Sequence, residues 1–448
     1  MTDWWSRSPE PIRVPSGGRI DGRASVPGSK SLTHRAYAVA LLARRPTVLV
    51  GALDAEDTRL FARALEALGY DVARSGERVR VRPTGRVVER GEIFCGNAGT
   101  LFRFLVALLA TVPGEWIVDG TPRLRERPVG PLVDALVPLG VEIDWIEEPG
   151  HAPLRLHGGS LAGGLTALDA GESSQYLSAL LLAGQRAAAP IEIEVERLVS
   201  SPYVDLTIDL LLAQGGIVER PEEGLYRTEP AVLVGGEIAI EPDLSAAAYP
   251  AAAAALSGGD ILIERVRLDS RQADRRLLEL LARMGAEVTV EPEGVRVAGG
   301  ALAAVTADLS EFPDQVPTLA ALAPFARGTT RIENVAHLRI KESDRLAAMA
   351  SELRRAGAEV EELADGLVIP GVWAEAPPPA DPVVVEPHDD HRIAMAMALV
   401  ALRRPNLSIS NPQCVAKSYP LFWRDLAHWL GADDDDEGKR RPNRASDP

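Results

Sequence analysis

Residues 27–35 place two cations and three hydroxyl groups in a turn that leads into an apolar helix. Ser29 fits the cap of that helix, and the backbone N–H groups at a helix start attract anions. Lys30 and Arg35 flank this start, so the segment predicts a phosphate or carboxylate site. A P-loop is excluded, because Gly28 is followed directly by Ser29 and the Gly-Lys-Ser/Thr pattern is missing. A capped surface helix with two solvated cations is the alternative for this segment taken alone.

Other polar segments in the first half also precede apolar helices. Residues 96–100, GNAGT, allow close backbone approach before a helix. Residues 172–175, ESSQ, place hydroxyl and amide groups at the start of YLSALLLA, and residues 200–203, SSPY, are similar. Simple helix capping explains some of these serines equally well. Three arginines crowd into one short segment, for which a solvated charge run is the alternative: Arg123, Arg125 and Arg127.

The second half carries carboxylates and cations at comparable places. Asp314 lies in a turn before VPTLAALAPFA, where a helix cap is the alternative. Residues 339–345, RIKESDR, are predicted to start a helix in which Lys341 and Arg345 share a face, while Glu342 can pair with Arg345. Surface salt bridges are the alternative there.

A second charged helix start and a late cation complete the set. Residues 389–392, DDHR, lead into IAMAMALVAL, and Lys417 lies in CVAKSYP. One histidine among carboxylates gives no metal-ligand spacing, so no metal is predicted.

A repeat that spans the chain must position these groups. In each copy an apolar helix ends at a glycine, and a strand, a turn and a second strand follow. The copies recur every 70 to 75 residues, which is too long for a solenoid unit. The glycines suit left-handed helix caps; they are Gly69, Gly140, Gly215, Gly285 and Gly357, with Gly431 as a sixth candidate. We therefore predict an α/β fold of two similar domains, each with three units whose helices cover small mixed sheets.

Composition narrows the function classes. The 448 residues carry a net charge of −16, with 46% hydrophobic and 25% charged residues. An acidic chain argues against nucleic-acid and anionic-membrane partners, so an anionic ligand needs a local basic site. The two cysteines fit a reducing compartment, and neither a signal core nor a membrane-spanning run is present. The expectation is a cytoplasmic, two-domain protein that is soluble, with a disordered charged tail at residues 433–448.

Nine motifs taken together resemble the enolpyruvyl transferase family, in its branch of 5-enolpyruvylshikimate-3-phosphate synthases. They occur in the family's order, over roughly residues 10 to 431: PGSKSLTHRA, GNAGTLFR, ERPVG, ESSQYLSALL, LVSSPY, FPDQVPTLAAL, RIKESDRL, DDHRIAMA and CVAKSYP. The family fold has two domains of three α/β units, which agrees with the repeat. The resemblance implies a first domain at residues 30–242 and a second at 243–432 that is completed by residues 1–29, with the active site in the cleft.

The resemblance also implies a reaction. The family moves the enolpyruvyl group of phosphoenolpyruvate onto the 5-hydroxyl of shikimate 3-phosphate and releases phosphate through a tetrahedral intermediate. Glyphosate competes with phosphoenolpyruvate in this family. No cofactor is implied, and we expect a monomer. Asp314 is expected to take the hydroxyl proton and Glu342 to protonate the methylene carbon, with Lys30 as a rival acid.

Binding residues follow from the same motif matches. Those implied for shikimate 3-phosphate are Lys30, Ser31, Arg35, Ser173, Ser174, Gln175, Ser200, Tyr203, Asp314, His337 and Lys341. Those implied for phosphoenolpyruvate are Lys30, Asn97, Gly99, Arg127, Gln175, Arg345, Arg392 and Lys417. Arginines suit both ligands because a guanidinium engages two oxygens at once.

Two positions depart from the family pattern. Phe104 follows Arg103 where many relatives carry proline, and His337 stands where some relatives place asparagine against the shikimate ring.

Two other functions stay open. One is the sister enzyme that transfers enolpyruvyl to a nucleotide sugar, which typically carries a reactive cysteine; residues 111–127 contain none. The other is a repeat scaffold that binds phosphorylated metabolites without catalysis, in which Asp314 and Glu342 would not be needed.

Overall fold

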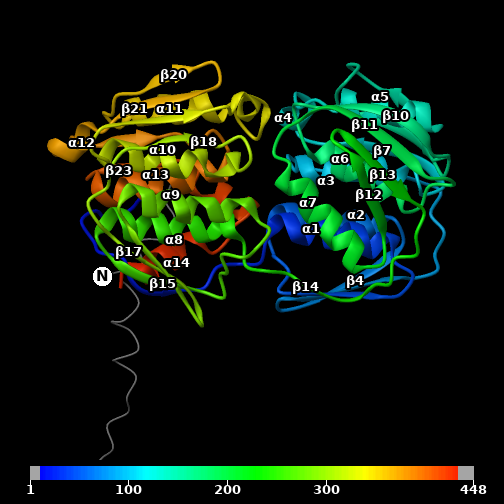
Figure 1. The fold of residues 1–448 in the computed structure, drawn as a ribbon, viewed down its shortest axis with the longest axis horizontal. Helices are drawn as coiled ribbons and strands as arrows, with labels where there is room; N and C mark the ends of the chain where they lie inside the picture. Colours follow the sequence, from blue (N-terminus) through cyan, green and yellow to red (C-terminus); the bar gives the residue numbers. More distant parts are fainter. Residues whose placement is uncertain (1–10, 432–448) are drawn as a thin grey trace, which may run out of the picture.

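The computed structural model describes residues 11–431. Figure 1 shows two lobes side by side, each built from helices and small sheets. One hydrophobic core draws its residues from 36–240, and the other draws them from 12–26 and 244–429. We call the parts around these cores lobe one and lobe two. The predicted mixed α/β fold is confirmed.

Lobe one holds three sheets of four strands, each combining a parallel pair with an antiparallel hairpin. In spatial order the first sheet contains β14 (Gly236–Ala239), β3 (Thr47–Val50), β5 (Arg78–Pro83) and β4 (Tyr70–Ser75). The second contains β6 (Arg90–Phe94), β7 (Gly114–Asp119), β9 (Leu154–Gly158) and β8 (Glu142–Trp145). The third contains β10 (Gly164–Ala170), β11 (Ile191–Leu198), β13 (Leu225–Glu229) and β12 (Ile217–Glu222).

Lobe two repeats this plan, with a smaller third sheet. Its first sheet contains β16 (Glu287–Glu291), β17 (Gly294–Ala298), β15 (Asp260–Glu264) and β2 (Asp21–Ala24). Its second contains β18 (Thr306–Asp308), β19 (Thr329–Glu333), β21 (Gly366–Pro370) and β20 (Glu361–Leu363). Its third contains β1 (Ile12–Arg13), β23 (Leu407–Ile409) and β22 (Val383–Val385).

The chain crosses between the lobes twice, and the two crossings run together. Strand β2 pairs in lobe two before the chain enters lobe one, and β14 pairs in lobe one before the chain returns. The crossing segments meet as an antiparallel bridge between Gly28 and Pro242. Asp243 then accepts hydrogen bonds from the amides of Lys30 and Ala246, at the starts of one helix in each lobe. One carboxylate thus ties both helix starts to the crossing.

The predicted glycine caps are confirmed. Backbone φ is positive at every repeat glycine, from +73° at Gly431 to +110° at Gly285. Only glycine adopts this left-handed conformation at little cost. Each helix therefore ends where the sequence pattern placed its end.

Helices form two shells in each lobe. The inner helices pack on one another and are mostly buried, as their largely apolar sequences require. They are α1 (Lys30–Leu42), α3 (Gly99–Leu109) and α6 (Gln175–Gly184) in lobe one, with α8 (Leu244–Ser257), α10 (Val316–Leu322) and α13 (His391–Arg403) in lobe two. The outer helices are α2 (Glu56–Ala67), α5 (Gly130–Leu136), α7 (Pro202–Ala213), α9 (Arg276–Met284), α11 (Arg345–Arg355) and α14 (Phe422–Trp429).

Short helical turns link these elements. The α-helical turns are α4 (Pro122–Arg125) and α12 (Val372–Glu375), and the 3₁₀ turns are Val137–Leu139, Ala273–Arg275, Pro313–Gln315, Ala323–Phe325, Ala336–Ile340 and Pro412–Lys417. Across residues 11–431, no helix is long and apolar enough to cross a membrane. The charged tail at 433–448 lies outside the described residues, and the predicted domain boundaries stay a prediction.

One departure from the family pattern has a clear structural setting. Phe104 is buried inside α3, which runs unbroken from Gly99 to Leu109. The guanidinium of Arg35 lies over its ring, 5.6 Å from the ring centre. A cation is attracted to the face of an aromatic ring, so Phe104 helps to hold the Arg35 guanidinium in place.

Candidate active site

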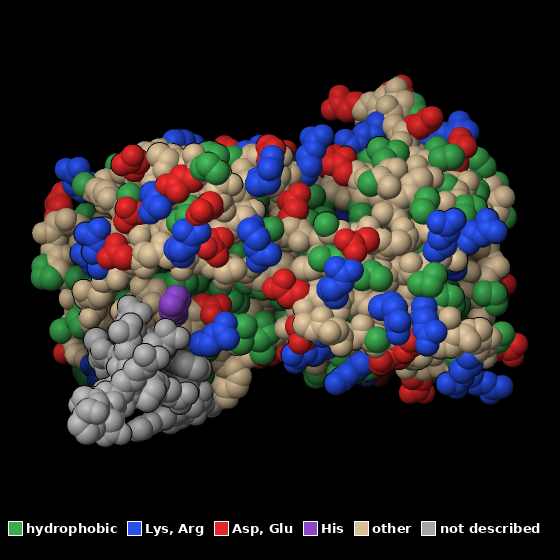
Figure 2. All heavy atoms as spheres, turned by 90° about the horizontal axis from the view of Figure 1, so that it is seen from below, with side chains coloured by type: hydrophobic (Ala, Val, Ile, Leu, Met, Phe, Trp, Pro, Cys, Tyr) green, Lys and Arg blue, Asp and Glu red, His purple; other side chains and the backbone are tan. Residues whose placement is uncertain are grey.

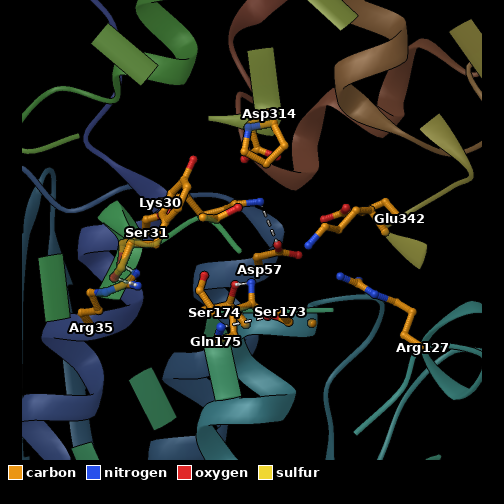
Figure 3. A pocket seen from close by; sticks show the side chains of 16 residues that line it. Lys30, Ser31, Arg35, Asp57, Arg127, Ser173, Ser174, Gln175, Asp314 and Glu342 are labelled. Carbon is orange, nitrogen blue, oxygen red and sulfur yellow. Dashed lines mark hydrogen bonds and ion pairs between the residues drawn. The ribbon is translucent and has the colours of Figure 1, made fainter. Parts of the chain in front are cut away.

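A pocket lies between the lobes, and both contribute to its lining (Figure 3). Most of its residues come from the starts of inner helices, where backbone N–H groups favour anions. The lining residues are Lys30, Ser31, Arg35, Asp57, Gly99, Thr100, Arg127, Ser173, Ser174, Gln175, Ser200, Tyr203, Pro313, Asp314, Lys341 and Glu342. In Figure 3 Asp314 and Glu342 reach in from lobe two opposite the groups of lobe one.

The remaining predicted site residues lie directly behind this lining. Arg345 and Arg392 hydrogen-bond Asp314, Lys417 bonds Asp57, and Asn97 bonds Arg127. His337 interacts electrostatically with Lys341 and Asp314. The structure thus brings the predicted residues together around one pocket, while the ligand assigned to each stays a prediction.

The start of α1 has the geometry expected of an anion site. Ser29 caps the helix by accepting a hydrogen bond from the Leu32 amide. Arg35 is buried and donates to the Thr207 hydroxyl, 2.8 Å away, and to the carbonyls of Ser31 and Tyr203. Burial lowers the pKa of Arg35 to about 10. The guanidinium therefore fixes the two neighbouring pocket residues as well as lining the pocket itself.

Asp57 is a site residue that sequence reasoning missed. Its carboxylate lies 2.8 Å from the Lys417 ammonium and 3.4 Å from that of Lys30. Burial opposes its ionisation, but the two lysines outweigh burial and lower the pKa of Asp57. A signal was present, because Asp57 falls on the same buried face of α2 as Phe61 and Ala64. A carboxylate on an apolar stripe needs a buried cation.

Arg127 occupies the space that a side chain at position 99 would need. The Arg127 guanidinium is buried, and it donates to the backbone and side-chain oxygens of Asn97 at 3.0 and 3.2 Å. A Cβ atom at Gly99 would lie 2.4 Å from this guanidinium. Glycine is required there by the arginine itself, in addition to any ligand. Burial lowers the pKa of Arg127 to about 10, and Glu342 partly offsets that effect.

The start of α6 presents hydroxyl groups and an amide. Ser173 and Ser174 are buried beside the pocket, and Ser173 accepts a hydrogen bond from the Gln175 amide. The Gln175 side chain accepts from Arg103 and donates to Thr100, which fixes its orientation. Ser200 has a positive φ of +53°, a conformation that costs a non-glycine residue free energy. Its hydroxyl donates across the cleft to the Ser310 carbonyl at 3.0 Å.

Arg345 organises the carboxylates of lobe two. It is buried, and it donates to Asp314 at 2.8 Å, Glu342 at 2.9 Å and Asp390 at 2.7 Å. Arg392 also donates to Asp314. Burial opposes ionisation of Asp314, but Arg392 and Arg345 lower its pKa. The pKa of Glu342 is lowered far more, because Arg345, Arg127 and Lys30 outweigh its burial. Both carboxylates are therefore ionised beside these cations.

The segment around Glu342 corrects one prediction. Lys341, Glu342 and Ser343 are not helical, and α11 begins only at Arg345. Asp344 caps that helix by accepting a hydrogen bond from the Ala347 amide. The expectation that Lys341 and Arg345 share a helix face is therefore wrong. This non-helical segment lets Glu342 and Lys341 both reach the pocket.

Half-buried Lys341 and buried His337 are bases whose pKa values are lowered. Burial, with Arg103 and Arg127 nearby, lowers the pKa of Lys341 to about 7. Burial also lowers the pKa of His337 to about 4, so its imidazole is neutral at physiological pH. Arg123 of lobe one donates to the Lys341 carbonyl at 2.9 Å. A bound anion beside Lys341 would raise the pKa of Lys341 and so favour its positively charged form.

The site is a local basic region in an acidic protein. Seven cations line it or lie directly behind it: Lys30, Arg35, Arg127, Lys341, Arg345, Arg392 and Lys417. Within residues 11–431, no group of three His, Cys, Asp or Glu side chains is arranged to hold a metal ion. Buried arginines with planar forks suit phosphate and carboxylate groups, and paired carboxylates suit proton transfer.

Comparison with known proteins identifies the relatives of this chain. The model of the family described as EPSP synthase (3-phosphoshikimate 1-carboxyvinyltransferase) matches residues 14–426. The chain is 46% identical to the 3-phosphoshikimate 1-carboxyvinyltransferase of Syntrophobacter fumaroxidans over 410 residues, which are 90% of this chain and 96% of that protein. It is 39% identical to the enzyme of the same name from Aliivibrio salmonicida, over 91% and 96% of the two chains. The solved EPSP synthase of Acinetobacter baumannii superposes with a TM-score of 0.77 at 28% identity, over 93% and 97%.

Proposed function

Because this chain belongs to the EPSP synthase family, we propose that its cleft binds phosphoenolpyruvate beside shikimate 3-phosphate and transfers the enolpyruvyl group to the 5-hydroxyl. The enzyme is a 3-phosphoshikimate 1-carboxyvinyltransferase of the shikimate pathway. The observation that carries the site assignment is the clustering of buried cations from both lobes around Asp314 and Glu342. Both substrates are multiply anionic, and such a cluster suits two anions held side by side.

We assign shikimate 3-phosphate to the side of lobe one. The hydroxyl-rich starts of α6 and α7, with Arg35 and Lys341, surround that part of the pocket. Phosphoenolpyruvate is assigned to the cations between the lobes, namely Lys30, Arg127, Arg345, Arg392 and Lys417. The backbone at Gly99 and the side chains of Asn97 and Gln175 complete this second group.

The chemistry is an addition followed by an elimination. Asp314 accepts the proton of the 5-hydroxyl as that oxygen bonds to C2 of phosphoenolpyruvate, and the methylene carbon gains a proton to become a methyl group. Loss of phosphate and of one methyl proton then restores the double bond. Ionised Asp314 is ready for the base role, since Arg345 and Arg392 hold it as a carboxylate.

Glu342 needs a proton before it can act as the acid. Its pKa is held low by the same cations that are assigned to phosphoenolpyruvate. The negative charges of that substrate neutralise these cations and so raise the pKa of Glu342. Protonation of Glu342 would therefore follow substrate binding, and Lys30 remains the alternative acid.

The nucleotide-sugar alternative is disfavoured by the cysteines. Cys95 is buried, Cys414 is partly buried, and desolvation raises the pKa of both thiols. Neither is the activated thiolate that a reactive cysteine requires. Offering the protein phosphoenolpyruvate with shikimate 3-phosphate, with unphosphorylated shikimate or with a nucleotide sugar tests this directly. Of the three acceptors offered with phosphoenolpyruvate, we expect only shikimate 3-phosphate to give phosphate release above background. Phosphate release with the nucleotide sugar instead would overturn the proposed substrate.

We further propose a cytoplasmic monomer with no nucleic-acid or membrane partner. On the face shown in Figure 2, acidic and basic side chains are interspersed over both lobes. A nucleic-acid-binding face would instead gather cations over a broad area. Residues 30–242 and 243–432 are proposed as the two domains, the second completed by residues 1–29.

The pKa of Lys341 gives a prediction for substrate binding. Only protonated Lys341 attracts an anion, and its pKa is about 7 in the free protein. Binding of shikimate 3-phosphate favours protonated Lys341, so above pH 7 the protein must take up a proton when the ligand binds. The dissociation constant should then rise by about tenfold per pH unit between pH 7 and 9, well above the substrate phosphate's own titration at about pH 6. Titration calorimetry in several buffers measures both the affinity and the proton uptake.

The matched variant is Lys341→Arg, whose guanidinium stays charged throughout this range. Its affinity for shikimate 3-phosphate should be nearly independent of pH. If the unmodified protein also showed a flat profile without proton uptake, Lys341 would not contact this ligand.

A further inference from the structure

One hydrogen bond crosses the cleft between a half-buried and a buried side chain. The Tyr203 hydroxyl, on α7 of lobe one, donates to the Asp274 carboxylate of lobe two at 2.8 Å. Tyr203 lines the pocket, whereas Asp274 lies behind it in the turn Ala273–Arg275. We propose that Asp274 is a positioning residue for the transfer reaction: it anchors Tyr203 and so stabilises the closed arrangement of the lobes. This inference rests on the proposed function.

The surroundings of Asp274 give this hydrogen bond weight. Its side chain belongs to a residue that is only 4% exposed. Ser245 donates to one carboxylate oxygen at 2.7 Å and Gln315 donates to the same oxygen at 2.8 Å. Within residues 11–431 no lysine or arginine lies within ion-pair distance of it. The Tyr203 hydroxyl is therefore the donor for the carboxylate oxygen that Ser245 and Gln315 do not reach, and a buried acceptor that loses its donor costs free energy.

The same bond joins groups assigned to the two halves of the reaction. On one side, the Tyr203 carbonyl accepts from Arg35 at 2.6 Å, and Arg35 also holds the Ser31 carbonyl. On the other side, Gln315 connects Asp274 to its chain neighbour Asp314, the proposed base. A shift of Tyr203 would thus move both the proposed acceptor-substrate site and the turn that carries Asp314.

Two other hydrogen bonds between the lobes have a backbone carbonyl as the acceptor. Ser200 and Arg123 donate to backbone carbonyls, of Ser310 and Lys341, which every residue type supplies. Lys417 pairs with Asp57 inside the proposed phosphoenolpyruvate site itself. The bond between Tyr203 and Asp274 can be removed from lobe one, by deleting the Tyr203 hydroxyl, and altered from lobe two, by changing the Asp274 carboxylate, so it can be tested by a double-mutant cycle.

The variants are Tyr203→Phe, Asp274→Asn and the double substitution. Phenylalanine removes only the hydroxyl group. Asparagine keeps an acceptor for Tyr203, and its new N–H group has a partner available, because the Gln315 side-chain oxygen has no hydrogen bond and a flip of that amide presents it. All three proteins are therefore expected to fold, which thermal melts will verify.

Leaving a buried acceptor without its donor corresponds to roughly a tenfold to hundredfold change in an equilibrium constant. Tyr203→Phe should raise KM for phosphoenolpyruvate by that factor, because this substrate is held by the closed cleft, and it should lower kcat less. Asp274→Asn should show a smaller rise in KM. The double variant should be no worse than Tyr203→Phe alone. The radius of gyration with shikimate 3-phosphate and glyphosate should exceed that of the unmodified complex in both Tyr203→Phe proteins.

Tyr70→Phe is the matched control. Its hydroxyl donates to the Leu41 carbonyl at 2.8 Å within lobe one, so its loss should leave both KM and the closed dimensions unchanged. Additive effects in the double variant, or an unchanged radius of gyration in Tyr203→Phe, would overturn the role of Asp274. Failure of the proposed function has a different signature, since the unmodified protein would then release no phosphate from the two substrates.

Discussion

Replacing Glu342 with glutamine is expected to slow turnover by roughly 10²–10⁴-fold, the range for a positioned acid or base, while the protein still folds. Glutamine keeps an oxygen that can accept the Arg345 hydrogen bond, which spans 2.9 Å. It removes the ability to carry a proton to the methylene carbon. If Glu342 only formed its buried ion pair with Arg345, the change would lower stability, by up to about 3–5 kcal/mol, and would leave the rate little changed. Single-turnover rates measured beside thermal melts separate these outcomes.

Asp314→Asn should behave in the same way, because asparagine cannot accept the hydroxyl proton. Both variants should still bind shikimate 3-phosphate measurably. Glu362→Gln is the matched control, since Glu362 pairs with Arg339 at 2.8 Å outside the pocket lining. Its turnover should match that of the unmodified protein. A near-normal rate in Glu342→Gln or Asp314→Asn would reduce that carboxylate to a structural partner of Arg345.

Arg127→Ala is expected to weaken phosphoenolpyruvate binding by roughly tenfold to a hundredfold, since a charge-assisted hydrogen bond is worth about 1.5–3 kcal/mol. Arg127 is buried at the pocket and still has an unpartnered Nε–H group, so it has donor capacity to spare for a ligand. Shikimate 3-phosphate, assigned to the other side, should lose far less affinity. Equilibrium titrations with each ligand measure the two losses separately.

Arg125→Ala supplies the comparison for this experiment. Arg125 lies two residues away, pairs with Asp119 and Glu147, and does not line the pocket. Its removal should change neither affinity. Equal losses of both ligands in Arg127→Ala would show that Arg127 holds the site together and does not select phosphoenolpyruvate.

Features set by local sequence were predictable. The glycine at each helix end and Ser29 as the cap of α1 follow from backbone conformation and from hydrogen bonds within a few residues. The polar helix starts were also recognised, because charged residues have little packing value before an apolar helix. The ligand expected at each of these helix starts follows from the family resemblance, because local sequence patterns do not distinguish one anion from another.

Features that depend on distant segments were not predictable. Asp57 meets Lys417 across 360 positions in the sequence, and Tyr203 meets Asp274 across the cleft. Neither pairing leaves a trace in local spacing. The wrong prediction at Lys341 has another cause. The charged residues 339–345 have helical spacing, but Asp344 caps the helix, which therefore begins only at Arg345. The pKa of Lys341 likewise depends on Arg103 and Arg127, which only the folded chain brings close to Lys341.

In the proposed reaction, this cleft joins phosphoenolpyruvate to shikimate 3-phosphate by addition and elimination. Mass spectrometry of the product of a reaction run in D₂O tests it most directly. Because the methylene carbon becomes a methyl group and then loses one of its hydrogens, we expect an enolpyruvyl product that carries deuterium on its methylene carbon, together with free phosphate. An enolpyruvyl product without carbon-bound deuterium would contradict the addition step, and the absence of any product from the two substrates would contradict the assignment as a whole.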